Sequence, residues 1–518
     1  MGLARAGLVV SGAFLVSRVL GWVRLVVIAN TVPLDQQDAF YAAFRIPDLI
    51  FMLVAAGALS SALVPIVAGL LEREEDAHAW RVVSTVINLM LIALALLAGA
   101  LFVLAPFVMG AITPGFDPEQ LERTIGLTRI MLLSPILLAM GSVATSVLNA
   151  GGRFAASAVA PIVYNLAIIG GALILSPTFG VEGVALGVAA GSLGHLLVQL
   201  QPLRALGFRY EARIDREDPE ARHALVLMAP RALGLGASQV TFIVVTALAS
   251  TLGVGAVAAF TIAFTLLQIP IGVIGVPLGI VLLPSLSRDA AVGRETEFAA
   301  LLTHALRLIL YVMIPIAGLT AVLRQELVDL LFGGGQIDET GLVLIATTLL
   351  WFLVGVAAHA LIAVLARAFY ARQDTLTPVL VAIAAVVMNT TLAVLLVGPL
   401  GLSGMALAIA LAAWMEALVL LVILRVRVDG LLLGNLARVA VQAVVGTAVA
   451  SALAFGTAAL IGRAIEPDPA AILLVLDVAA VSVIFALAYA TVSIVLRIPE
   501  LTSIVEVMAD LIRRPHRS

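Results

Sequence analysis

The chain has 518 residues, of which 62% are hydrophobic and only 12% are charged, with a mean hydropathy of +1.16. A soluble domain is about half apolar and a quarter charged, so this composition predicts a polytopic membrane protein. The formal charge of −3 says little about partners, but the chain has no cysteine and no lysine. This excludes disulfides, thiolate chemistry, a Schiff-base lysine and a Walker A lysine, and we therefore expect no nucleotide partner.

Apolar stretches long enough to cross a bilayer predict an all-α protein with about 14 transmembrane helices. The first stretch contains two arginines, which favours a retained helix over a cleaved signal. The stretches fall at about 7–30, 39–70, 81–111, 123–149, 155–176, 180–203, 222–251, 255–286, 298–323, 342–370, 376–398, 402–425, 434–462 and 470–497.

The arginines in the connecting loops lie mostly on one side of the predicted bundle. The loops of one side hold only Arg123, Arg324 and Arg463, whereas those of the other side and the two tails hold many more. Basic loops remain in the cytoplasm, so we expect both termini to be cytoplasmic, in agreement with an even number of helices.

Parts of the chain recur at a spacing of about 220 residues. Gly180-Val-Glu-Gly183 has a counterpart in Gly401-Leu-Ser-Gly404, and each follows an asparagine, Asn165 or Asn389. Because each half has six helices, the repeat is parallel, as in transporters with a substrate site between two lobes. The predicted domains are an N-terminal lobe at 1–203, a cytoplasmic linker at 204–222, a C-terminal lobe at 223–426, and two added helices with a tail at 427–518. We expect a solvated linker, with an amphipathic helix on the membrane surface as the alternative.

The first helix carries two arginines at depths where a guanidinium is costly in hydrocarbon. Arg18, Gly21 and Arg24 cover an arc of roughly 120° over a rise of about 9 Å, and the glycine leaves room for a bulky anion. We interpret this face as the wall of an anion-accepting cavity. For Arg18 the alternative is a buried ion pair that fixes helix packing.

The second helix adds Asp38, Arg45 and Asp48 close to the first pair of arginines. Arg24 and Arg45 are expected at similar depth, beside a kink at Pro47. The alternative is that both arginines extend toward the outer surface and pair with Asp38 or Asp48.

Other intramembrane polar residues give weaker signals. His195, His304 and His359 have no second imidazole at metal-ligand spacing, so we expect no metal site and no cofactor. No nucleophile–base pair is visible, and we therefore expect a protein that is not an enzyme. Glu416 and Asp477 are candidate proton-coupling groups.

Several blocks of the chain, in order over about the first 425 residues, resemble the lipid II flippase family (MurJ/MviN) of the MATE-like exporter superfamily. The strongest are the first and the last of these blocks. The blocks are Ser17-Arg-Val-Leu-Gly-Trp-Val-Arg24, Asp38 to Pro47, Gly57 to Pro65, Thr113 to Phe116, Asn149 to Phe154, Ala160-Pro161 with Asn165, Leu282 to Leu286, Leu331-Phe332 and Ala368 to Pro378.

The resemblance implies two six-helix lobes around a cationic cavity that opens alternately to each side, plus two C-terminal helices. It implies a multi-pass protein of the bacterial plasma (inner) membrane that flips lipid II, an undecaprenyl-diphosphate-linked precursor, toward the outer leaflet. By position, Arg18 and Arg24 match the family's cavity arginines, Asp38 matches its acidic residue and Arg45 a usually basic position. The implied partners are lipid II and membrane lipids, with cell-wall synthesis proteins as a further candidate class and no nucleic acid.

The chain departs from the family pattern at positions that bear on cargo and coupling. Two family arginines align with Met52 and Thr265, and a glutamate aligns with Ala56. The acids that hold sodium in some members fall near Val245 and Ala393. Two alternatives therefore stay open: an exporter of another lipid-linked or amphiphilic cargo, and an inactive member that acts as a cell-wall scaffold.

Overall fold

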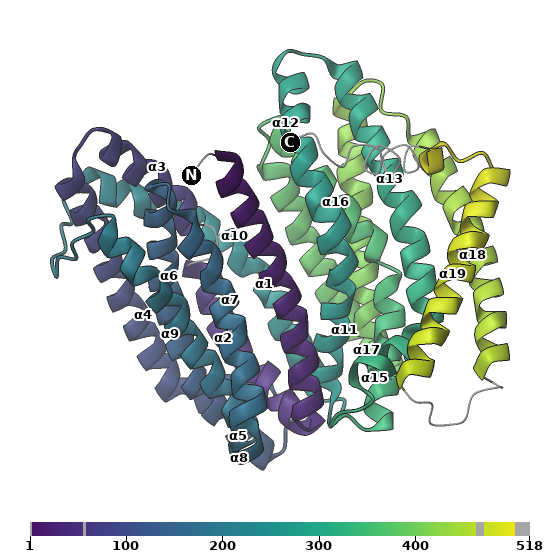
Figure 1. Ribbon diagram of the computed structural model, residues 1–518, viewed down its shortest axis with the longest axis horizontal. Coiled ribbons are helices and arrows are strands. Elements are labelled where there is room, and N and C mark those ends of the chain that lie inside the picture. Colours follow the sequence, from purple (N-terminus) through teal and green to yellow (C-terminus); the bar gives the residue numbers. More distant parts are fainter. Residues whose placement is uncertain (1–2, 55–57, 463–470, 503–518) are drawn as a thin grey trace. The chain divides into compact units, whose positions relative to one another are not determined.

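The computed structural model describes residues 3–54, 58–462 and 471–502, and these fold into helices and connecting turns without a strand (Figure 1). The expected all-α membrane fold is confirmed. Ala56 and Arg463, which entered the sequence argument, lie outside the described residues.

Within the described chain, ten helices are long and apolar enough to cross a membrane. The count is eleven if the helix pair 339–353 and 356–371, which is bent by 47°, is one broken span and not a re-entrant loop. One of the ten, Leu376–Arg427, contains two of the predicted spans, because two helices join end to end at Gly401, whose own backbone is not helical. The count of fourteen therefore stays a prediction.

The described chain divides into two compact units. Unit 1 comprises residues 1–258 and 335–338, and unit 2 comprises residues 259–334 and 339–518. The helices of unit 1 are α1 (Leu3–Thr31), α2 (Leu34–Val54), α3 (Ala58–Glu72), α4 (Asp76–Ile112), α5 (Pro118–Met131), α6 (Leu133–Ala150), α7 (Phe154–Gly170), the π-helix η1 (Gly171–Leu175), α8 (Ser176–Phe179), α9 (Val181–Ala205) and α10 (Pro219–Ser250).

The division between compact units differs from the boundary that the sequence repeat predicts. Helix α10, the first of the predicted C-terminal lobe, packs against α2, α3 and α4 and belongs to unit 1. The chain enters unit 2 near the start of α11 (Ala256–Pro270). The boundary between the two six-helix lobes at residues 204–222 stays a prediction.

A hydrophobic cluster holds α1, α2, α5 and α9 together in unit 1. Ile28 of α1 and Val32, which follows its end, pack with Phe40 of α2, Met131 of α5 and Val184 of α9, and all five are buried. Each removes apolar area from contact with solvent or lipid and fills the space between helices. This packing fixes the end of α1 and the start of α2, the two helices that carry the candidate arginines.

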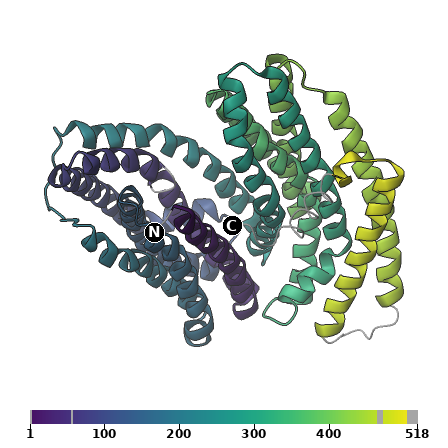
Figure 2. The ribbon, with the colours of Figure 1, turned by 45° about the horizontal axis from the view of Figure 1, so that its top comes forward.

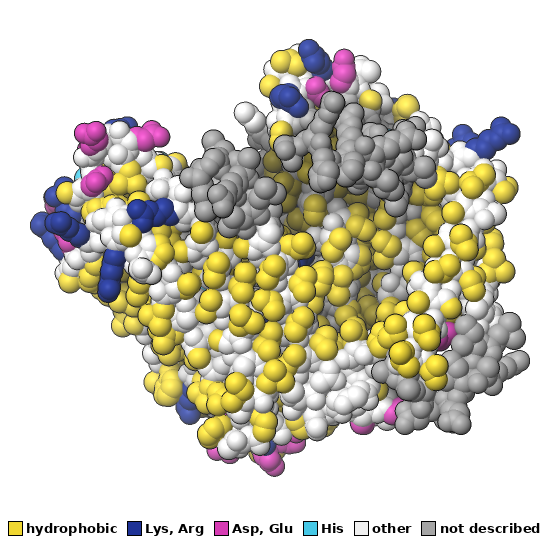
Figure 3. Space-filling model, viewed as in Figure 1, with side chains coloured by type: hydrophobic (Ala, Val, Ile, Leu, Met, Phe, Trp, Pro, Cys, Tyr) yellow, Lys and Arg dark blue, Asp and Glu magenta, His cyan; other side chains and the backbone are white. Residues whose placement is uncertain are grey.

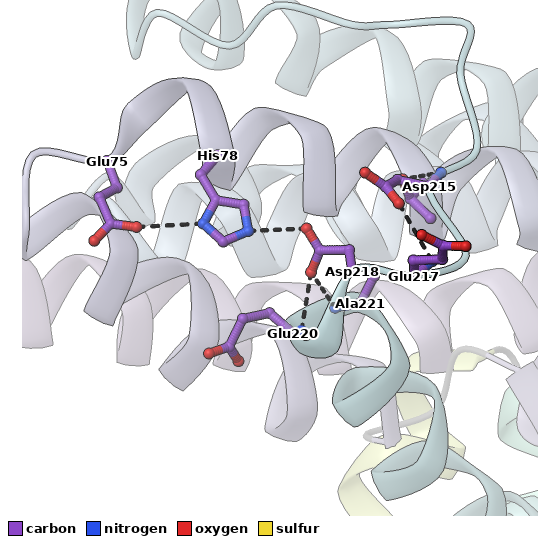
Figure 4. Close-up of polar contacts among 8 residues, drawn as sticks. Glu75, His78, Asp215, Glu217, Asp218, Glu220 and Ala221 are labelled. Atoms are coloured by element: carbon purple, nitrogen blue, oxygen red, sulfur yellow. Dashed lines mark hydrogen bonds and ion pairs between the residues drawn. The ribbon is translucent and has the colours of Figure 1, made fainter.

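The connection between α9 and α10 is fastened to α4. Figure 4 shows His78 of α4 between two carboxylates, with its Nε2 at 2.8 Å from Asp218 and its Nδ1 at 3.2 Å from Glu75. Asp218 also caps α10, because its Oδ1 accepts hydrogen bonds from the backbone N–H groups of Glu220 and Ala221. The start of α10 is thereby tied to the start of α4.

Further bonds extend this attachment along the connection. The side-chain amide of Asn88 donates to the carbonyls of Glu211 and Arg213, each at 2.9 Å, and the hydroxyls of Ser84 and Thr85 accept backbone N–H groups of the connection. Residues 206–218 form no helix, so the alternative of an amphipathic helix is wrong for this segment.

Unit 2 is a second helical bundle, with α18 and α19 side by side in yellow-green and yellow (Figure 2). Both pack on α13, where the hydroxyl of Tyr311 donates to Ser493 and that of Tyr489 donates to the carbonyl of Tyr311. Its helices are α11, the π-helix η2 (Ile271–Gly275), α12 (Val276–Ala291), α13 (Glu295–Val322), α14 (Arg324–Phe332), α15 (Glu339–Leu353), α16 (Val356–Ala371), α17 (Leu376–Arg427), α18 (Leu433–Gly462) and α19 (Ala471–Val495).

The outer surfaces of the helices suit a lipid environment. On the face shown in Figure 3, hydrophobic side chains cover the middle of the helices, while acidic and basic side chains gather near their ends. Leu96 and Phe107 of α4, for example, are 70% and 78% exposed. Large exposed apolar areas are unfavourable in water and expected in hydrocarbon.

Candidate functional site

A cavity of about 300 Å³ lies within unit 1, between α1, α2, α6, α7 and α9. One arginine and one carboxylate face it together with hydroxyl, imidazole and aromatic groups. Its lining residues are Arg24, Phe44, Pro47, Asp48, Phe51, Ser134, Leu138, Pro161, Tyr164 and His195. A hollow of this size with few convergent polar groups is typical of a ligand site.

Arg24 is the basic group of this cavity. Its side chain is half-buried, and it forms no hydrogen bond or ion pair with any residue that the structure describes. Asp48 also lines the cavity and interacts electrostatically with Arg24, and its Oδ2 accepts a hydrogen bond of 3.0 Å from Gln239 of α10. The guanidinium therefore retains its donors for a ligand, as an anion site requires.

Arg18 lies about two turns earlier on α1 and is also half-buried. Within the described part of the chain it has no ion-pair partner, which disfavours a buried pair that only fixes packing. Asn165 of α7 donates to the carbonyl of neighbouring Ser17 at 3.3 Å and so fixes the backbone of α1 beside Arg18. Arg18 does not line the cavity described above.

Arg45 is held against α10. Its Nε donates to the hydroxyl of Thr246 at 2.9 Å, and its guanidinium lies 5.4 Å from the ring centre of Phe242. Pro47, two residues later, does line the cavity, beside Asp48. These contacts orient the part of α2 that faces Arg24.

Asp38 is fully buried and binds the start of α11. Its carboxylate oxygens accept the backbone N–H groups of Gly255 at 2.5 Å and Ala258 at 2.7 Å. A carboxylate at a helix N-terminus satisfies otherwise unpaired donors and complements the helix dipole. The structure thus puts Asp38 outside the cavity lining.

The cavity also contains groups that the sequence reasoning did not select. His195 lines the cavity, although the sequence gives it no metal-ligand partner, and its ring packs directly on the backbone of α6, where a Cβ at Gly141 would collide with its Nδ1. Ser134 and Tyr164 also line the cavity, and no sequence motif indicates either of them. The only sequence signal for these residues is that each is a polar side chain within an apolar stretch. Whether such a side chain points into a cavity depends on packing between helices that are distant in the sequence.

The last motif block forms an ion-pair clasp at the α16–α17 turn in unit 2. Arg372 binds Glu295 of α13 through contacts of 2.7 and 2.8 Å, and Asp374 pairs with Arg427 at the end of α17. The residues of this block therefore have a structural role, because they join the ends of α13, α16 and α17.

The structure shows the environment of residues at which the chain differs from the family pattern, and that of Asn389. Met52 is half-buried on α2, and the hydroxyl of Thr265 donates to the carbonyl of Thr261 within its own helix. Asn389 of α17 is buried, and its Oδ1 has no hydrogen-bond partner among the described residues. In the described chain no group of three or more acidic or histidine side chains is arranged to hold a metal ion.

An all-helical bundle with an arginine-lined cavity inside its apolar span is typical of membrane transporters. The family described as "Lipid II flippase MurJ" matches residues 35–466. The chain belongs to this family.

Similar proteins and solved structures agree with the match. The chain is 33% identical over 446 residues to the "Lipid II flippase MurJ" of Burkholderia cenocepacia, covering 82% of this chain and 84% of that protein. It is 33% identical over 437 residues to the "Probable lipid II flippase MurJ" of Rhizobium tropici, covering 82% of this chain and 81% of that protein. A solved "Lipid II flippase MurJ, inward closed conformation" has a TM-score of 0.77 at 21% identity, covering 95% of this chain and 99% of that one.

A more distant solved structure has the same fold. A multidrug resistance MATE family transporter of the MOP superfamily in an inward-facing conformation gives a TM-score of 0.66 at 16% identity, with 80% of this chain and 95% of that one covered. The expected MATE-like architecture is therefore confirmed as a fold.

Proposed function

We propose that this chain is a secondary transporter that moves lipid II from the inner to the outer leaflet of the bacterial plasma membrane by alternating access. The observation that carries the proposal is the family match over residues 35–466. The guanidinium of Arg24 in the cavity of unit 1 supports it, because the diphosphate of lipid II is an anion that guanidinium groups bind well.

In this proposal Arg24 and Arg18 hold the diphosphate. Both arginines are half-buried on α1 and have no ion-pair partner among the described side chains. Asp48 keeps the cavity close to neutral when it is empty, which lowers the free-energy cost of Arg24 inside the membrane. Arg45 and Asp38 complete the headgroup site by positioning α2 and the start of α11.

The membrane arrangement is part of the same proposal. Fourteen spans form two lobes, at 1–203 and 223–426, with both termini in the cytoplasm, and the linker at 204–222 lies on the cytoplasmic side. The headgroup of lipid II passes through the cavity while its polyprenyl chain stays in lipid. The protein performs no covalent chemistry on it.

Membrane potential is the proposed source of energy. One elementary charge moved through 100 mV supplies about 2.3 kcal/mol, enough to bias a transport cycle. We expect dissipation of the potential to stop flipping, and continued flipping in depolarised cells would argue for another source.

Replacement of a bacterium's own lipid II flippase tests the cargo. We expect cells that depend on this chain to grow and to present lipid II at the outer leaflet, measured by its accessibility to an externally added modifying enzyme. Failure of a correctly inserted chain at normal protein level would reject lipid II as cargo and favour another lipid-linked substrate or a scaffold role.

A further inference from the structure

A second polar hollow lies in unit 2, at the point where α18 begins and α19 ends. Its volume is about 250 Å³, and three of its seven lining residues are arginines from three different segments. We call it the arginine pocket. Its lining residues are Arg307 of α13, Asn435, Arg438, Val439 and Gln442 of α18, and Arg497 and Pro499 after α19.

The arginine pocket has an excess of positive charge and unused donors. Glu500, only 1% exposed, accepts from Arg307 at 2.6 Å and neutralises one of the three cations. Among the residues that the structure describes, the Nε of Arg307 has no hydrogen-bond partner, and Arg438 and Arg497 make no ion pair. Three guanidinium groups with free donors around one hollow match an anion.

The backbone at Arg497 fixes the end of α19 in the wall of the arginine pocket. Arg497 has φ of 51°, and the N–H groups of Arg497 and Ile498 donate to the carbonyls of Ile494 and Ser493. This is a Schellman helix end, whose left-handed position normally carries glycine. Gln442 fixes the same turn by donating to the carbonyl of Leu496 at 3.1 Å. Arg497 therefore occupies a left-handed helix-end position in the wall of the arginine pocket.

The position of the arginine pocket indicates which anion it binds. Helices α18 and α19 are apolar enough to cross a membrane, so their ends lie at the boundary between lipid and water. Next to the pocket, Val441 and Val445 of α18 are 62% and 46% exposed, and Ile494 and Val495 of α19 are 66% and 72% exposed. A basic hollow beside exposed apolar helix faces fits an amphiphile whose headgroup carries a phosphate.

We propose that the arginine pocket binds the phosphate of an anionic phospholipid, whose acyl chains lie along α18 and α19. The bound lipid links the end of α19 and the start of α18 to α13 through Arg497, Arg438 and Arg307. This site is separate from the cavity of unit 1 and does not depend on the identity of the transported cargo. Its predicted effect is on the stability of unit 2.

Thermal unfolding of the purified full chain in an uncharged detergent tests the proposal. The probes are dioctanoyl phosphatidylglycerol, dioctanoyl phosphatidylcholine of the same chain length, and inorganic phosphate. The double variant Arg438→Gln/Arg497→Gly removes two cations while giving the helix end its preferred glycine, so the fold without lipid should keep its stability. Arg425→Gln, which removes an exposed arginine outside the pocket, is the matched control.

We expect phosphatidylglycerol to raise the unfolding temperature of the parent chain and of Arg425→Gln, with an apparent affinity at least about tenfold weaker in the double variant. An equal response of the double variant, or an equal effect of phosphatidylcholine, would overturn the proposal. An equal effect of inorganic phosphate at the same concentration would show a site for the free ion and would overturn the assignment to a lipid.

Discussion

Gly180 and Gly401, about 220 residues apart, have the same unusual backbone conformation. Their φ/ψ angles are 63°/−145° and 56°/−137°, in a region that only glycine occupies readily. Three residues after each, a second glycine approaches the backbone of the preceding segment: a Cβ at Gly183 would lie 2.6 Å from the carbonyl carbon of Leu175, and one at Gly404 would collide with the carbonyl oxygen of Leu396. The repeat in the sequence is thus also a repeat in local structure.

Replacement of Gly401 by alanine tests the strain at this turn. No atom lies within 4 Å of the added Cβ, so the effect comes from the backbone alone. We expect Gly401→Ala to destabilise the protein by about 1–3 kcal/mol, measured as a lower unfolding temperature in detergent. Gly398→Ala is the control, because Gly398 is helical with open space around it and alanine favours helix there. Equal effects of both variants would contradict the argument.

Removal of Arg24 should abolish transport without unfolding the protein. We expect Arg24→Ala to lose at least about tenfold in flipping rate, because a charged hydrogen bond to the diphosphate contributes about 1.5–3 kcal/mol. Arg18→Ala should have the same direction of effect. The measurement is growth and outer-leaflet lipid II in flippase-depleted cells, with protein level as a check. Arg81→Ala, an exposed arginine on α4, should behave as the parent chain.

The contact between Gly141 and His195 should be visible as a compensating pair. Gly141→Ala places a Cβ against Nδ1 of His195 and forces the ring to move, with an expected loss of about 1–3 kcal/mol. His195→Ala removes the ring, so the double variant should recover most of the stability lost in Gly141→Ala. Additive losses in unfolding experiments would show that the two sites do not interact.

The cap at Asp38 predicts a difference between two substitutions. Asp38→Ala leaves the N–H groups of Gly255 and Ala258 without an acceptor and should cost about 1–3 kcal/mol. Asp38→Asn keeps one acceptor oxygen and should retain part of this stability. If both variants unfold at the temperature of the parent but lose transport, Asp38 acts on the cargo and the capping role is minor.

The ion-pair clasp predicts a dependence of stability on pH. The hydroxyl and backbone N–H of Thr377, together with Arg427, lower the pKa of Asp374 from the usual 3.8 to about 2. Because the folded pKa lies below the unfolded pKa, the ionised carboxylate stabilises the fold above about pH 4, and this contribution is lost as the pH falls toward about 2.

The difference in unfolding temperature between the parent and Asp374→Asn should therefore narrow as the pH is lowered from about 6 to about 3. Asp429→Asn, at an exposed carboxylate near the same end of unit 2, serves as the control. If the difference in unfolding temperature stays constant over this pH range, ionised Asp374 does not stabilise the fold through a lowered pKa.

Composition and periodic apolar stretches were sufficient to predict the helical membrane fold, because a bilayer demands long apolar helices wherever the chain crosses it. The break at Gly401 could also be predicted from the sequence, since its glycine motif repeats that of Gly180. The packing between helices could not be predicted from the sequence. Nothing near α10 in the sequence indicates that it joins unit 1, because this depends on faces of α2, α3 and α4.

The candidate site was predictable only in part. Arg24 was selected by the free-energy cost of a buried guanidinium and does line a cavity. Asp38 was selected by resemblance, but its partners Gly255 and Ala258 are far away in the sequence, so its capping contacts could not be foreseen. His195 has no second histidine nearby in the sequence, and its packing against Gly141 on another helix is visible only in the structure.

The attachment of residues 206–218 to α4 has a consequence for handling the protein. A protease that cuts this connection would leave α10 bound to unit 1, since His78, Ser84, Thr85 and Asn88 hold the connection on both sides of a break. The chain passes from unit 1 to unit 2 near the start of α11, not in that loop. A nicked preparation would therefore migrate as two fragments under denaturing conditions and as one particle in detergent.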